Sequence, residues 1–281
     1  MEMEKRIEEI QFPRLVKKEI PSKEFMNRIR SYPAKENTIT MWALGQNGYI
    51  LKTPEDVLIA IDPYLTDYCA SKRTGIRTER SRILPVFIEP EDLAVDVMVI
   101  THSHCDHADP FTLERYAWKE RTIFLAPWQA VQVLKEAGIP AGRIELMHPL
   151  QSWKGDGVEI IGSFAEPTSF DDLNHLGFVF RFSNGKVYYN SGDTAKTELL
   201  IHVRSFQIDW MTICINGGYH NLSHWEAAEI VSEIKPKVAV PAHFDMMPHN
   251  VQPPHMFRQS LFKLAPEVVY RELRYYTAEE F

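Results

Sequence analysis

Long apolar runs are missing from this chain. None of its 281 residues belongs to a stretch near the roughly 18 apolar residues that a membrane-spanning helix needs. The first six residues, MEMEKR, are mostly charged and do not have the character of a signal peptide. We therefore expect a cytoplasmic protein without membrane contact.

Cysteine is scarce. The three cysteines, Cys69, Cys105 and Cys214, are odd in number and far apart in the sequence. This pattern suits a reducing compartment and argues against a disulfide framework or a cysteine-rich zinc knuckle.

An excess of positive charge is also lacking, since 31 Lys and Arg residues face 38 Asp and Glu residues and leave a net charge of -7. This balance disfavours nucleic acid as a partner. With 44% hydrophobic residues, the length is sufficient for a sizeable core. We expect one domain over residues 1–281, with residues 1–37 as an N-terminal appendage.

Strand and helix signals alternate along the chain, and strands come before helices in both halves. The expected strands are Ile39–Leu44, Gly48–Lys52, Val57–Ile61, Val95–Ile100, Thr122–Leu125, Arg143–Met147, Val158–Gly162, Phe178–Phe182, Val187–Asn190, Trp210–Ile215, Val238–Pro241 and Val268–Arg274. The expected helices are Lys23–Arg30, Pro110–Lys119, Pro127–Glu136, His224–Ile234 and Met256–Leu264. This order predicts an α/β (α+β) fold with two sheets packed face to face and helices outside, a four-layer αββα sandwich.

The most informative segment is Thr101–His107, which follows the apolar strand Val95–Ile100. It carries four ligand-type side chains within six residues: His102, His104, Asp106 and His107. In extended backbone the first two histidines point to the same side. Four buried polar groups without a common partner would cost several kcal/mol, so we predict that they bind a metal ion.

Two later strands end in further ligand candidates. Asp193 follows Val187–Asn190 after Gly192, where a missing side chain allows close backbone approach. His243 follows Val238–Pro241 in the same way. The repeated placement at strand ends predicts that both side chains join the metal site.

At this point the chain resembles the metallo-β-lactamase superfamily, and within it the L-ascorbate-6-phosphate lactonase-like hydrolases. The segments that carry the resemblance are Met41–Gly45, Ile61–Tyr64, Thr101–His107, Ser191–Thr194, Ile215–Gly217 and Pro241–His243. The resemblance implies two metals, with His102, His104 and a third histidine at the first metal, Asp106, His107 and His243 at the second, and Asp193 bridging both.

The third histidine is open between His175 and His148. His175 precedes the strand that pairs with the one delivering Asp193, and we prefer it; His148 is more typical of a solvated loop. We interpret Cys105 as a small packed thiol. Asp62 is interpreted either as a hydrogen-bond acceptor for a ligand histidine or as a strand-terminal turn residue.

The nitrogen and oxygen ligands suit two divalent transition-metal ions, Mn or Zn, with Fe or Ni also compatible. The expected reaction is hydrolysis by a metal-bound hydroxide that forms from a water molecule. Asp106 is expected to orient that hydroxide or to shuttle the proton. By resemblance the substrate is a small anionic molecule, a phosphorylated lactone or related ester. The irregular loop 66–92 is expected as one wall of the site or as a solvated surface loop, and Arg73, Arg77 and Arg82 as candidates for holding the anion.

Two alternatives belong to other functions. A phosphodiesterase or ribonuclease of the same superfamily would need a basic groove, which the sequence does not show. A non-catalytic metal-binding sensor would close its coordination sphere with protein side chains, whereas an enzyme leaves one position open. A homo-oligomer is compatible with the sequence.

Overall fold

The computed structural model describes residues 16–71 and 80–281, and within them two seven-stranded sheets. In spatial order the first sheet contains β14 (Glu279–Glu280), β1 (Thr40–Gly45), β2 (Gly48–Lys52), β3 (Leu58–Ile61), β4 (Val97–Val99), β5 (Ile123–Ala126) and β6 (Ile144–Leu146). Strands β1 to β3 are antiparallel, and β3 to β6 are parallel.

The second sheet repeats this plan. Its spatial order is β13 (Val269–Tyr270), β12 (Val238–Ala242), β11 (Trp210–Cys214), β10 (Val187–Asn190), β9 (Leu176–Phe182), β8 (Val158–Phe164) and β7 (Ser152–Gly155). Strands β7 to β10 are antiparallel and β10 to β13 parallel. Strands β10, β11 and β12 therefore bring their carboxyl ends to the same edge, where a shared site can form.

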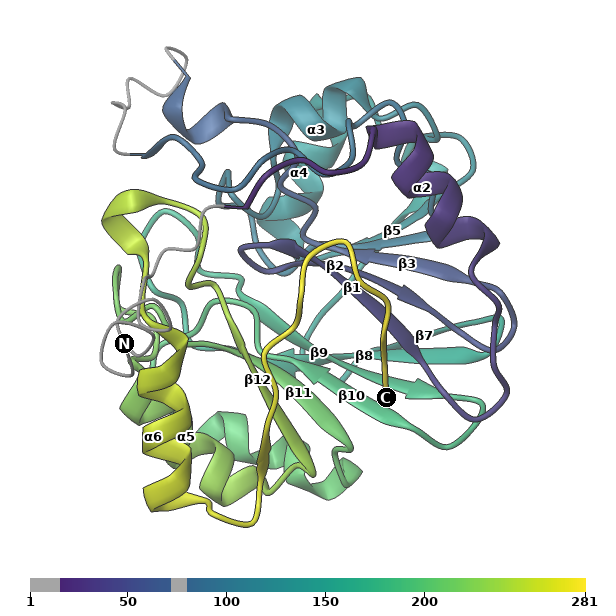
Figure 1. Cartoon of the computed structure of the whole chain (residues 1–281). Coiled ribbons are helices and arrows are strands. Elements are labelled where there is room, and N and C mark those ends of the chain that lie inside the picture. The colour runs from purple at the N-terminus through teal and green to yellow at the C-terminus, as the bar shows by residue number, and fades with distance from the viewer. Residues whose placement is uncertain (1–15, 72–79) are drawn as a thin grey trace, which may run out of the picture.

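Helices cover the outer face of each sheet and make the fold a four-layer αββα sandwich, as the sequence predicts (Figure 1). The first sheet is covered by α2 (Ser22–Ser31), α3 (Pro110–Arg115) and α4 (Trp128–Glu136). The second is covered by α5 (His224–Ile234), α6 (Pro254–Leu264) and the 3₁₀ segment η4 (Glu198–Phe206). Short 3₁₀ turns are η1 (Tyr68–Ala70), η3 (Ala141–Arg143) and η5 (Pro248–Asn250).

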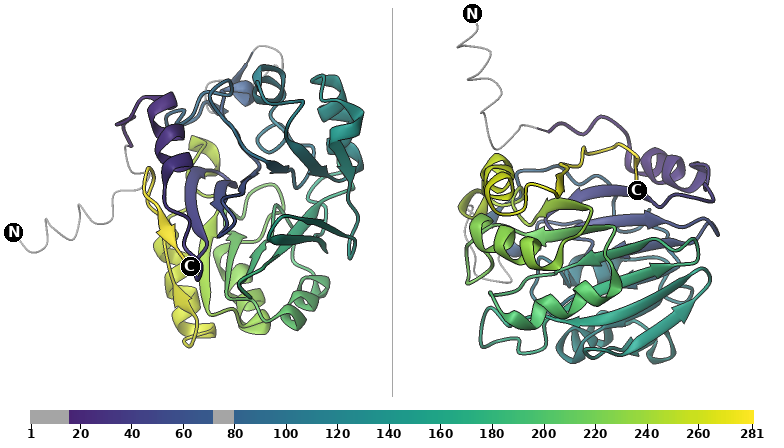
Figure 2. Two further views of the ribbon diagram at one scale, coloured as in Figure 1. Left: turned by 90° about the vertical axis from the view of Figure 1, so that its right-hand side faces the viewer. Right: turned by 90° about the horizontal axis from the view of Figure 1, so that it is seen from below.

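The core between the sheets is apolar and aromatic. Phe180, Tyr188 and Trp210 of the second sheet stack on one another and face apolar side chains of β1 to β4. Phe281 stacks on Trp210 at a ring-centroid distance of 4.8 Å. The C-terminus lies beside the first strands in both views of Figure 2, because β14 pairs with β1. The chain end thus closes one side of the core.

Several elements differ from the sequence-based expectation. The helix expected over Pro110–Lys119 ends at Arg115, because Tyr116 turns to extended backbone and buries its ring, with its hydroxyl 2.5 Å from Thr122 Oγ1. Strands β7 and β14 and the segment η4 were not predicted, since β7 is largely exposed and β14 has two residues.

The N-terminal appendage is described from residue 16 onward, and residues 1–15 lie outside the described part of the chain. Helix α2 packs Phe25, Met26 and Ile29 onto the core of the first sheet. No helix in residues 16–71 and 80–281 is long and apolar enough to cross a bilayer.

Candidate metal centre

The loop after β4 carries the histidine motif, and its conformation is fixed at both ends. Thr101 N–H donates to Asp62 Oδ1 at 2.8 Å, and Asp109 caps α3 by accepting from Phe111 N–H. Between these anchors the His104 carbonyl accepts from the backbone N–H groups of His107 and Ala108 at 2.9 and 2.8 Å. This tight turn places all four ligand-type side chains on one side of the loop.

A first cluster contains three histidines. His102 Nε2 lies 2.9 Å from His104 Nδ1, and the His175 ring lies 4.0 Å from the His102 ring between centroids. The three offer nitrogens within 4.8 Å of one another. The preferred third histidine, His175, therefore lies in the expected place, because β9 begins beside the loop and Leu176 N–H donates to Thr101 O at 3.0 Å.

A second cluster contains Asp106, His107 and His243, again with ligand atoms within 4.8 Å of one another. His243 Nε2 lies 3.2 Å from Asp106 Oδ2, and the rings of His107 and His243 are stacked at 5.2 Å between centroids. The structure thus brings together the two sets that the resemblance implied.

Asp193 lies between the clusters. Its Oδ1 is 3.4 Å from His107 Nε2, its Oδ2 is 3.4 Å from His243 Nε2, and its backbone carbonyl accepts from His175 Nδ1 at 3.0 Å. Together with His102 and His107 it forms another group of potential ligands. This position suits a carboxylate shared between two ions.

Buried polar atoms aimed at the centre lack hydrogen-bond partners among the described residues. They include His107 Nε2, His175 Nε2 and Asp193 Oδ1. Each such group would cost about 1–3 kcal/mol if it stayed unpaired. Divalent cations coordinated by imidazole nitrogen and carboxylate oxygen would satisfy all three, so the residues present fit a metal centre.

The charges around the centre agree with this fit. Burial, together with the neighbouring His107, holds the pKa of His102 well below its usual value, so this imidazole is neutral and able to coordinate. Burial alone would raise the pKa of Asp193, but His243 and His107 lower it and keep the carboxylate ionised. His107 and His243 likewise lower the pKa of Asp106 against the effect of burial, and in return Asp193 and Asp106 raise the pKa values of these two histidines. The two ionised carboxylates thus attract positive charge to this point.

Hydrogen bonds from surrounding residues orient the candidate ligands. Asp62 Oδ2 lies 2.7 Å from His107 Nδ1, which turns Nε2 toward the centre. The same carboxylate accepts from Thr101 Oγ1 at 2.6 Å and from Asn47 Nδ2 at 2.7 Å. Asp62 is fully buried, and these contacts favour the interpretation of Asp62 as the acceptor for a ligand histidine.

The centre opens into a cavity of about 710 Å³. Asp106, Asp193 and His243 line its base, and the loop that carries Cys69 and Arg80 forms part of its wall. The expectation that loop 66–92 borders the site therefore holds for its described part. A volume of this size accommodates a small molecule.

Some predicted residues have other roles. Arg82 does not face the cavity as an anion-binding residue, because its guanidinium donates to the backbone carbonyls of Tyr64, Thr66, Leu84 and Pro85. This is a correction: the arginine holds the loop together. Arg73 and Arg77 lie outside the described residues. His148 is exposed in a loop, as expected, and belongs to none of the ligand groups.

The cysteines add a contact that sequence reasoning missed. Cys105 Sγ lies 2.7 Å from Cys69 Sγ, and both residues line the cavity. Gln46 was also missed, although its side chain reaches Asp106 and His243. A single glutamine in a turn does not indicate a functional side chain. The adjacent Asn47 and Gly48 indicate only that a hairpin turn forms here.

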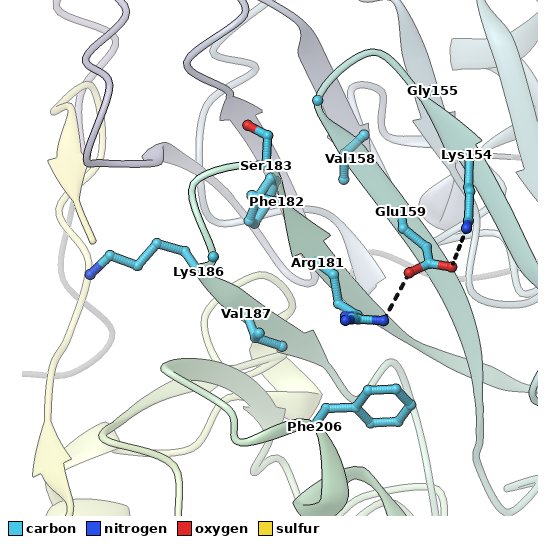
Figure 3. A pocket seen from close by; sticks show the side chains of 12 residues that line it. Lys154, Gly155, Val158, Glu159, Arg181, Phe182, Ser183, Lys186, Val187 and Phe206 are labelled. Carbon is cyan, nitrogen blue, oxygen red and sulfur yellow. Dashed lines mark hydrogen bonds and ion pairs between the residues drawn. The ribbon is translucent and has the colours of Figure 1, made fainter.

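A second hollow, of about 430 Å³, lies where β10 begins, at the opposite end of that strand from Asp193 (Figure 3). Glu159 extends into it between two cations, at 3.5 Å from Lys154 and 3.0 Å from Arg181. These charges satisfy one another at the surface. We therefore assign the chemistry to the centre that contains Asp193.

Comparison with known proteins agrees with the geometry. Residues 40–243 match the family described as the Beta-lactamase superfamily domain. The matched segment covers most of the chain. The chain belongs to the metallo-β-lactamase superfamily. The matched segment begins at β1 and ends at His243, so it contains every ligand candidate of this metallo-β-lactamase fold.

Relatives of this superfamily member are named as hydrolases. The UPF0173 metal-dependent hydrolase of Thermoplasma acidophilum is 24% identical over 197 residues, covering 66% of this chain and 75% of the relative. That of Anaeromyxobacter sp. (strain K) is 26% identical over 246 residues, covering 81% and 82%. Igni18, a metallo hydrolase from Ignicoccus hospitalis, has a similar fold, with a TM-score of 0.69, 21% identity and coverage of 87% and 98%. All three relatives are named as metal-dependent or metallo hydrolases.

Proposed function

We propose that this metallo-β-lactamase family member binds two divalent transition-metal ions and hydrolyses a small phosphorylated lactone or a related ester. The observation that carries the two-metal part is the pair of ligand clusters on either side of Asp193. Mn and Zn are the proposed metals, and Fe or Ni would suit the same donor set.

When bound, the ions would lower the pKa of an attacking water and polarise the oxygen of the scissile group. The chain's own residues supply the rest. Asp106 is partly exposed to the cavity while Asp193 is nearly buried, so Asp106 is the carboxylate that a substrate can reach. We assign to Asp106 the orientation of the attacking water and the transfer of its proton.

The proposal for an anionic substrate has support at the cavity wall. The Arg80 guanidinium lies 5.6 Å from the centre of the Tyr219 ring, and both line the cavity with His220 and His249. A phosphate group placed beside Arg80 would receive a charge-assisted hydrogen bond while the ester faces Asp106. Arg80 thus replaces Arg82 as the candidate that holds the anion.

A substrate screen tests this proposal. The purified protein, loaded with Mn²⁺ or Zn²⁺ separately, is assayed on phosphorylated lactones, their unphosphorylated counterparts, phosphodiesters, RNA and thioesters. We expect phosphorylated lactones to be opened fastest, with a rate that rises with pH to a plateau, because the attacking water acts as its conjugate base. Cleavage of RNA with every lactone untouched would move the assignment to the nuclease alternative.

The role of Arg80 has its own test. Arg80→Ala should raise KM for the phosphorylated substrate by about tenfold or more, the equivalent of one charge-assisted hydrogen bond, and leave kcat nearly unchanged. Arg204→Ala, an exposed arginine on η4, is the matched control and should leave both constants unchanged. Equal effects of Arg80→Ala on phosphorylated and unphosphorylated lactones would contradict the role.

A further inference from the structure

The β1–β2 turn is unusual because its two central residues are buried. Gln46 is 3% exposed and Asn47 is 2% exposed, although turn residues normally face solvent. Gln46 has a φ of +58°, in the left-handed region that glycine and asparagine usually occupy. Such strain at a residue with a long side chain points to a function for that side chain.

The backbone of Gln46 is bound to the segment that carries His243. Its N–H donates to Asp245 Oδ1 at 2.8 Å, and its carbonyl accepts from His243 N–H at 2.9 Å. These bonds hold the turn and the end of β12 together and direct the Gln46 side chain toward the second cluster.

The side-chain amide of Gln46 reaches two members of that cluster. Its nitrogen lies 2.6 Å from Asp106 Oδ2 and 2.9 Å from His243 Nε2, and those two atoms are themselves 3.2 Å apart. The amide group therefore occupies the side of the cluster at which Asp106 and His243 converge. The Asn221 amide makes a different contact from the Gln46 amide. Its nitrogen donates to Asp193 Oδ2 at 2.6 Å, and its oxygen has no hydrogen-bond partner among the described residues.

A cation held by Asp106 and His243 would face the N–H groups of Gln46, which is unfavourable. A half-turn about the last side-chain bond exchanges the amide nitrogen and oxygen, whose assignment rests only on the hydrogen-bond pattern. The exchange removes the repulsion and presents a carbonyl-type oxygen, a donor that hard cations accept.

We propose that Gln46 is a further metal ligand, through its amide oxygen, at the metal held by Asp106, His107 and His243. This inference rests on the proposed two-metal centre. The added oxygen makes the second position richer in oxygen donors than the three-histidine position, so the second metal is the one expected to favour Mn²⁺ over Zn²⁺.

Cobalt titration tests the assignment with the full chain. Metal-free protein is titrated with Co²⁺ alone, and affinity and visible absorption are recorded for each equivalent. Gln46→Met keeps the side-chain length without an oxygen and should weaken the binding of one of the two equivalents, the one held by Asp106, His107 and His243, by about tenfold or more. Its absorption band should also intensify, because cobalt with fewer ligands absorbs more strongly. Gln46→Glu keeps an oxygen and should restore both properties.

Asn221→Leu is the matched control, because it removes an amide that donates to a ligand carboxylate at the same 2.6 Å. It should alter affinity without intensifying the band. A Gln46→Met protein with unchanged affinity, or with weaker binding but an unchanged band, would overturn the assignment and leave Gln46 as a hydrogen-bond donor to Asp106. A wild-type chain that binds a single Co²⁺ would instead contradict the two-metal centre itself. Circular dichroism of the metal-free variants verifies folding.

Discussion

Polar side chains that lie near the two ends of strand β10 differ in burial and in pairing. Where β10 ends, Asp193 is 5% exposed, and its Oδ1 has no hydrogen-bond partner among the described residues. Where β10 begins, Arg181 and Lys154 are exposed and both bind Glu159. Paired charges at a surface require nothing further, whereas buried polar atoms without a hydrogen-bond partner indicate where an ion can bind.

The difference shows which property marks the candidate site: polar side chains that converge in a buried place, rather than the presence of a hollow. The hollow of Figure 3 and the cavity above Asp193 both have room for a small molecule, at about 430 and 710 Å³. The second also contains side chains whose polar atoms converge from separate loops. The following variants test this comparison.

The largest effect is expected for Asp193→Ala. Because this carboxylate lies between the clusters, its loss should weaken both metals together, each by more than the roughly 10–100-fold that is typical of replacing an outer hydrogen-bond partner. Metal content after dialysis against a chelator measures the effect. Retention of both ions with unchanged affinity would show that Asp193 acts only as a structural residue.

His175→Ala should remove one of the two ions, which is about half the loss of metal expected for Asp193→Ala. His175 Nε2 is unpartnered in the described part of the chain and belongs to the three-histidine cluster. The variant should lose the ion of that cluster and keep the one held by Asp106, His107 and His243. Elemental analysis that still finds both ions, or a loss confined to the second position, would contradict the assignment.

A smaller effect is expected for Asp62→Asn, which changes a hydrogen-bond acceptor of His107 rather than a ligand. Replacing such outer partners typically weakens metal affinity by about 10–100-fold. The second metal should be affected and the first nearly unchanged, as competitive titration with a coloured chelator would measure. Equal weakening of both positions would point to a general loss of structure.

The smallest effect is expected at the other end of β10. Glu159→Gln removes the ion pairs with Lys154 and Arg181, which are exposed and contribute roughly 0–1 kcal/mol each. Metal content should not change, and thermal unfolding should shift only slightly. A loss of metal from this variant would contradict the view that only the groups near the end of β10 hold the metals.

Much of the candidate centre could be predicted because most of its candidate ligands follow apolar strands. His102, His104, Asp106 and His107 share one short segment, and the buried strand before it marks where they lie. Asp193 and His243 follow the same pattern, and His175 could be preferred through its place before a hairpin strand. The paired sheets followed from the order of strands and helices.

Other features depend on contacts between distant parts of the chain and leave no local pattern. Gln46 meets His243 across 197 positions, and Cys69 meets Cys105 across 36. Arg82 could be recognised as basic, but the four carbonyls that bind its guanidinium are set by the fold of the loop. The end of α3 likewise depends on burial of Tyr116 rather than on helix-forming residues.

The central claim is that two divalent ions bind on either side of Asp193. Anomalous diffraction from crystals of the Mn²⁺- or Zn²⁺-loaded protein, recorded at the absorption edge of the metal, measures it most directly. We predict one peak among His102, His104 and His175 and another among Asp106, His107 and His243, both adjacent to Asp193. Metal-loaded crystals with a single peak, or with none, at these residues would contradict the account.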